Sequence, residues 1–159
     1  MNTSTSPKSS SSTDRIEKTM VLRAPRPKVW RALPNSAQFG EWFGVEVNEP
    51  FTPGHRVRGP FTIPGHTHLT FEITVEQMEP ERLFSWRWQP GGDPDIDPAE
   101  PTTLVVFELE DVPEGTRLTV TETGFDRIPP SRRGKAYREN EAGWSGQMEA
   151  IRKYLASPA

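Results

Sequence analysis

The stretch TLVVFELEDVPEGTRLTVTETGF, residues 103–125, decides the fold of this chain. Residues 103–111 and 115–123 alternate apolar and polar side chains, a pattern typical of strands with one buried face. Gly124 and Phe125 then lead into a long amphipathic segment. This order predicts a curved antiparallel sheet with a helix packed across it, and a cavity between the two.

The C-terminal segment is predicted to be a helix that begins near Ser131, after Pro129 and Pro130. Its apolar positions form one stripe at helical spacing: Tyr137, Trp144, Met148, Ile151 and Leu155. Gly143 and Gly146 each cost a helix roughly 1 kcal/mol relative to Ala. We therefore expect a compensating reason for them, such as close backbone approach or room for a ligand.

The preceding residues predict the rest of an α+β fold. A first strand over 15–24 is followed by two short helices, one between Pro25 and Pro34 and one over 36–44. Further strands are predicted over 45–47, 55–63, 69–78 and 82–89, separated by Pro and Gly turns. Alternation predicts these side chains on the inner face: Leu69, Phe71, Ile73, Val75, Phe84, Trp86, Trp88, Val105, Phe107, Leu109, Leu118 and Val120.

Length and composition limit the classes of function. The 159 residues predict a single domain over 15–157, preceded by a disordered Ser/Thr-rich tail over 1–14. The 19 basic and 22 acidic residues are mixed along the chain, so no basic stripe favours nucleic acid. There is no cysteine, which excludes disulfides and thiolate zinc sites.

The sequence also predicts where the protein works. The N-terminal tail has no apolar core of a signal peptide, and no apolar run reaches the 18 or more residues of a membrane span. We therefore expect a cytoplasmic protein that does not contact a membrane. The oligomeric state is left open.

Several short motifs occur in a fixed order along the chain. They are Ala24-Pro25, Val29-Trp30 with Leu33, Trp42-Phe43-Gly44, residues 79–88 (EPERLFSWRW), residues 115–125 (GTRLTVTETGF), and Asn140 with Gly143-Trp144. In this order they resemble the domain related to the C-terminal part of the Hsp90 ATPase activator (AHSA1-type). That family belongs to the START/Bet v 1-like (SRPBCC) superfamily, and the resemblance runs from about Arg15 to Ala156.

The resemblance implies a helix-grip fold: an antiparallel sheet of six to seven strands wrapped around a long C-terminal helix, with two short helices after the first strand. It also implies a hydrophobic cavity whose ligands vary widely among members. The eukaryotic activator has a separate N-terminal domain that engages the chaperone, and nothing in this sequence corresponds to it.

We therefore expect a small, largely apolar molecule to bind between the sheet and the helix, and favour binding over catalysis. One alternative, implied by the superfamily, is a cyclase or hydrolase that uses Glu122, Tyr137 and Asn140 in the cavity. The other is a module that binds an Hsp90-type chaperone through the outer face of the sheet.

Eight residues are the candidate ligand-binding set. Six are aromatic, because inward rings give an apolar ligand a surface on which to pack, although such rings can equally form an ordinary core. Two are polar residues expected near the same space. The set is Trp42, Phe71, Trp86, Trp88, Phe107, Glu122, Asn140 and Trp144.

Glu122 is the most informative of the set. It continues the inward parity of Leu118 and Val120, so its carboxylate is expected to point toward the helix. A buried acid needs a partner, and the candidates are Asn140, Tyr137 and Arg87. Alternatively, the strand ends before Glu122 and the side chain faces water.

Asn140 lies four residues before Trp144 and so shares its helix face. Either a ligand or a backbone group of the sheet could satisfy its amide.

No metal or cofactor is expected. His66 and His68 share a strand face, and the third histidine, His55, lies on a neighbouring strand. Because Pro64-Gly65 marks a hairpin tip, we expect these histidines to be exposed. No nucleophile paired with a base and no glycine-rich phosphate loop is present in the sequence.

Overall fold

The computed structural model describes residues 14–90 and 96–156. The predicted N-terminal tail lies outside these residues except for Asp14. No helix of the described residues is long and apolar enough to cross a membrane.

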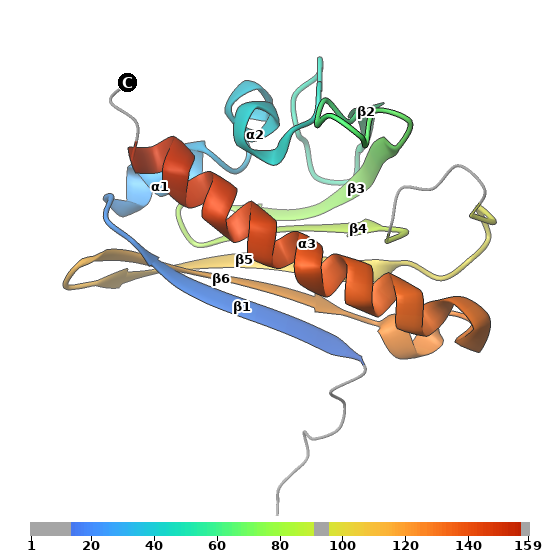
Figure 1. Cartoon of the computed structure of the whole chain (residues 1–159). Helices are drawn as coiled ribbons and strands as arrows, with labels where there is room; N and C mark the ends of the chain where they lie inside the picture. Colours follow the sequence, from blue (N-terminus) through green and yellow to red (C-terminus); the bar gives the residue numbers. More distant parts are fainter. Residues whose placement is uncertain (1–13, 91–95, 157–159) are drawn as a thin grey trace, which may run out of the picture.

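The sheet has six strands, and Figure 1 shows a long helix across one of its faces. The first strand is followed by two short helices, five further strands and the long helix. In chain order the elements are β1 (Arg15–Leu22), α1 (Arg26–Arg31), α2 (Ser36–Phe43), β2 (Arg56–Pro60), β3 (Thr70–Glu79), β4 (Leu83–Trp88), β5 (Thr103–Val112), β6 (Gly115–Thr123), the 3-10 helix η2 (Phe125–Arg127) and α3 (Pro130–Ala156). The predicted α+β helix-grip architecture is confirmed.

The strands are antiparallel in the order β1-β6-β5-β4-β3-β2. The chain therefore runs as a meander from β2 to β6, and β1 pairs with β6 at the edge. In the β5–β6 pair Val105 lies opposite Glu122, and Phe107 lies opposite Val120. The predicted inward parity is confirmed for this pair, because Val105, Phe107 and Val120 are buried while Glu108 is exposed.

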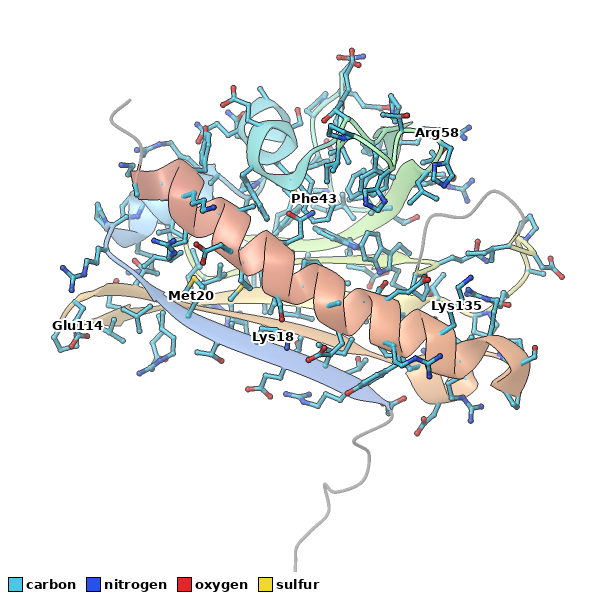
Figure 2. All side chains as sticks on the ribbon, in the orientation of Figure 1. Lys18, Met20, Phe43, Arg58, Glu114 and Lys135 are labelled. Carbon is cyan, nitrogen blue, oxygen red and sulfur yellow. The ribbon has the colours of Figure 1, made fainter. Side chains whose placement is uncertain are left out.

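The short helices are bounded by local signals. The Asn35 side chain accepts a hydrogen bond from the Gln38 N–H at 3.0 Å and so caps the start of α2. Gly44 ends α2 in a left-handed conformation with a φ of 87°. Because α2 stops there, Phe43 lies at its end beside α3 (Figure 2).

Polar contacts also join the helices and β1. Gln147 of α3 donates to the Phe43 carbonyl at 2.9 Å. Lys18 lies on the same face of β1 as the buried Ile16 and Leu22 and donates to Glu141 of α3 at 2.5 Å. An ion pair at the edge of the sheet thus accounts for a charged residue on this face.

One predicted strand and one of the two reasons suggested for the α3 glycines were wrong. Residues 45–47 form no strand, and Val45 makes only an isolated bridge with Phe61. Residues 45–47 pass close to β2 at Gly59, since a Cβ on Gly59 would lie 1.9 Å from the Glu46 carbonyl oxygen. Gly143 and Gly146 are exposed, with nothing within 4 Å of a Cβ at either position, so close backbone approach does not explain them.

Candidate functional site

The carboxylate of Glu122 lies between the sheet and α3. The residue belongs to β6, and its inward parity leaves it 0% exposed. The alternative of a solvated Glu122 is therefore wrong, because β6 continues to Thr123.

Four side chains donate hydrogen bonds to this carboxylate. From the sheet, the Trp88 indole and the Thr103 hydroxyl donate to Oε2 at 2.8 and 2.6 Å. From α3, the Trp144 indole donates to Oε1 at 2.7 Å, and the Asn140 amide lies 2.9 and 3.0 Å from the two oxygens. We call Glu122 and these four residues the Glu122 cluster.

The cluster uses the acceptor capacity of the carboxylate fully. A carboxylate offers about four lone-pair sites, and indole N–H groups can only donate. Each oxygen accepts from at least two donors, one of them an indole. The arrangement fixes the orientation of the Trp88 and Trp144 rings and ties α3 to the sheet.

The expected partners of Glu122 are present only in part. The hydrogen bond from Asn140 is confirmed, and an amide satisfied only by a backbone group of the sheet is not observed. The Tyr137 hydroxyl instead donates to the Arg15 carbonyl at 2.8 Å. The Arg87 Nε lies 3.8 Å from a carboxylate oxygen of Glu76, with which it forms an ion pair.

Three of the donors to Glu122 do not follow from the sequence pattern. Strand parity and helical spacing predict Trp88 and Trp144 as ring surfaces but do not predict hydrogen bonds from their N–H groups. The pattern assigns no role to Thr103. A signal for Thr103 is the strand register, since it lies opposite Trp88 and two residues before Val105, the partner of Glu122.

An aromatic cluster fills the space beside this carboxylate. Its centre is Trp86, which is 0% exposed. The rings around it have centroids 5.2 to 6.3 Å from the Trp86 ring and come from the sheet, α2 and α3: Phe39, Phe43, Phe71, Phe84, Trp88, Phe107 and Trp144.

Five of the six aromatic candidates thus share one cluster, and Trp42 lies at its edge. The Trp42 ring packs on Phe39 and Phe43, and its N–H donates to the Ala32 carbonyl at 2.7 Å. Trp42 therefore supports α2 rather than facing the centre of the cluster.

Two surface depressions lie away from the candidate residues. One, of about 590 Å³, is lined by residues around Ala24 and Pro113 at the β5–β6 turn. The other, of about 290 Å³, lies on the sheet beside Arg82, Glu108 and Arg117. Neither includes any of the eight predicted ligand-binding residues.

α2 and α3 meet along one side of the aromatic cluster. The Phe43 ring lies 6.0 Å from the Trp144 ring across this contact. Nearer the C-terminus of α3, burial raises the pKa of Tyr154, and the carboxylate of Glu41 on α2 raises it further.

The described residues contain no group of three or more His, Asp or Glu side chains placed to hold a metal ion. His55, His66 and His68 are exposed, as expected for the two at the hairpin tip.

Comparison with solved structures shows the same fold. Protein MLL2253 from Mesorhizobium loti is 25% identical with a TM-score of 0.70, over 89% of this chain and 96% of that one. Protein Ms6760 from Mycobacterium smegmatis is 18% identical with a TM-score of 0.74, over 92% and 93%. DynU16, a protein of the dynemicin biosynthetic locus, is 26% identical with a TM-score of 0.71, over 91% of this chain but only 48% of its own.

Comparison with curated proteins gives no match. Among protein families, the one described as "Activator of Hsp90 ATPase homolog 1-like protein" matches residues 23–156, which include all of the Glu122 cluster and the aromatic cluster. The chain therefore belongs to the Activator of Hsp90 ATPase homolog 1-like family.

Proposed function

We propose that this chain binds a small, largely apolar molecule between the inner face of the sheet and α3. The observation that carries the proposal is the aromatic cluster around Trp86, which brings rings from β3, β4, β5, α2 and α3 to one place. Apolar ligands are commonly held by such a surface with a few fixed polar groups.

The family supports the same proposal. Proteins of this fold commonly bind hydrophobic ligands. DynU16 comes from a biosynthetic locus, a setting that is compatible with a small-molecule ligand.

A ligand reaches these rings by separating α2 from α3. The rings are packed against one another, so an entering molecule replaces ring contacts. The contact between α2 and α3 is held at Phe43, whose ring packs on Trp144 and whose carbonyl accepts a hydrogen bond from Gln147. Phe43 is thus the first ring of the aromatic cluster that an entering ligand contacts.

We do not extend the proposal to catalysis by Glu122. A general base needs a lone pair within hydrogen-bond reach of the proton it abstracts. Both Glu122 oxygens are already occupied by protein donors. In the proposal Glu122 holds the ring walls in place and does not react.

Native mass spectrometry of freshly purified protein is the first test. A discrete adduct of a few hundred daltons, absent from the denatured chain, is the expected result. The second test is a titration with the apolar compound fluorene, followed by tryptophan fluorescence.

A matched pair of variants tests whether fluorene binds at the contact between α2 and α3. Phe43→Leu is expected to weaken fluorene binding by up to about tenfold, since one aromatic pair contributes about 0.5–1.5 kcal/mol beyond its buried area. Phe51→Leu is the control, because Phe51 is also buried but packs on Phe39 and Phe84, away from α3. No adduct and no fluorene binding, or equal weakening by both variants, would overturn the proposal.

A further inference from the structure

The indole N–H of Trp86 lacks a hydrogen-bond partner. Among the described residues, this nitrogen is the one buried side-chain nitrogen or oxygen that has no hydrogen-bond partner. The N–H groups of Trp42, Trp88 and Trp144 all have acceptors at 2.7 to 2.8 Å. Because buried polar groups in folded proteins are nearly always paired, this exception requires an explanation.

No acceptor within the described residues bonds to the Trp86 N–H. Seven aromatic rings pack around Trp86, and aromatic faces accept hydrogen bonds only weakly. The carboxylate of Glu122 already accepts hydrogen bonds from the neighbouring indoles of Trp88 and Trp144. The unpaired donor therefore lies inside the apolar surface where the proposed ligand binds.

We propose that Trp86 selects the ligand by donating its indole N–H to a neutral oxygen, such as a ketone, on an otherwise apolar frame. This inference rests on the proposed ligand-binding function. A site with a buried donor discriminates strongly against an analogue that lacks the acceptor, because the donor then stays unpaired.

The charge of the site favours a neutral acceptor over an anion. Glu122 already places a carboxylate beside the ring of Trp88, whose centroid is 5.4 Å from that of Trp86. Within the described residues, the hydrogen bonds to Glu122 come from Trp, Thr and Asn side chains, and none comes from Lys or Arg. A carboxylate or phosphate on the ligand would therefore be repelled without a compensating cation.

The test compares fluorenone with fluorene, which share one ring frame and differ in a carbonyl group. Wild-type protein is expected to bind fluorenone about tenfold more tightly, the effect of one neutral hydrogen bond. In an NMR spectrum of the indole N–H groups, fluorenone is expected to move the Trp86 proton signal downfield, and fluorene is not.

Two variants assign the effect. Trp86→Phe is expected to bring the affinity ratio close to one. Trp30→Phe, which replaces a partly buried indole of α1 outside the aromatic cluster, is expected to preserve it. If Trp86→Phe does not fold, the wild-type ratio and the indole signal still decide the outcome.

The results separate the two proposals. Equal binding of the two compounds to the wild type, with no shift of the Trp86 signal by fluorenone, overturns the role of Trp86 and leaves apolar binding intact. Binding of neither compound overturns both.

Discussion

Replacing Glu122 by Gln tests whether the carboxylate clamps α3 to the sheet. Gln keeps the shape but presents an NH2 group at one of the two oxygen positions. At the Oε1 position this NH2 faces the Trp144 indole, and at Oε2 it faces the Trp88 indole. In either orientation one indole N–H, of the buried Trp144 or of the half-buried Trp88, loses its acceptor.

The size of the effect follows from this conflict. A buried donor left unpaired costs about 1–3 kcal/mol. The remaining hydrogen bonds also weaken, because bonds to a charged acceptor are roughly twice as strong as neutral ones. We expect a loss of about 2–4 kcal/mol in the free energy of unfolding, which for a domain of this size lowers Tm by roughly 4–16 °C.

Urea denaturation followed by far-UV circular dichroism measures this loss without relying on the tryptophans of the cluster. Glu108→Gln is the matched control, since Glu108 is an exposed glutamate on β5. The control is expected to change stability by no more than about 0.5 kcal/mol. If Glu122→Gln also stayed within about 0.5 kcal/mol of the wild type, the clamp would be refuted.

Three further predictions concern α3. Trp144→Phe removes one donor to Glu122, so its destabilisation, measured by urea denaturation, should combine less than additively with that of Glu122→Gln; strict additivity would contradict a shared cluster. Gly143→Ala should raise stability by about 0.5–1 kcal/mol in thermal unfolding, because the position is exposed and open; a loss would mean that the face is occupied. Because the pKa of Tyr154 is raised in the folded state, its contribution to the free energy of unfolding is present below the unfolded-state pKa of about 10. This contribution is lost as the pH rises through the folded-state pKa. Tyr154→Phe should therefore lose less stability than the wild type in alkaline urea titrations, and parallel curves would contradict this assignment.

The strands were predictable where alternation was long and regular. β6 has the predicted bounds, and β3, β4 and β5 agree within a residue or two. The strand predicted over 45–47 failed because three residues carry too little periodicity to separate a strand from a single bridge. The register shift between Val75 and Gln77 has no sequence signal, and it places the Ser85 hydroxyl where it accepts from the Gln77 N–H.

The candidate site was predictable only in part, for a chemical reason. Parity located Glu122, and helical spacing placed Asn140 with Trp144. Residue spacing predicts the apolar rings of Trp88 and Trp144 at the site but not the hydrogen bonds of their N–H groups. Whether a given indole meets an acceptor depends on the rotation of its ring, which residue spacing does not determine.

The even division of donors around Glu122 determines how α3 can leave the sheet. Trp88 and Thr103 share the sheet with Glu122, while Asn140 and Trp144 belong to the helix. Lifting α3 therefore strips the carboxylate of the helix donors and leaves the sheet donors in place. Asn140 and Trp144 are released together, because they lie four residues apart on one face of the same helix. The interface between α3 and the sheet thus separates between the helix donors and the Glu122 carboxylate. Trp88 and Thr103 keep the carboxylate in place, so it is already oriented to accept the helix donors again.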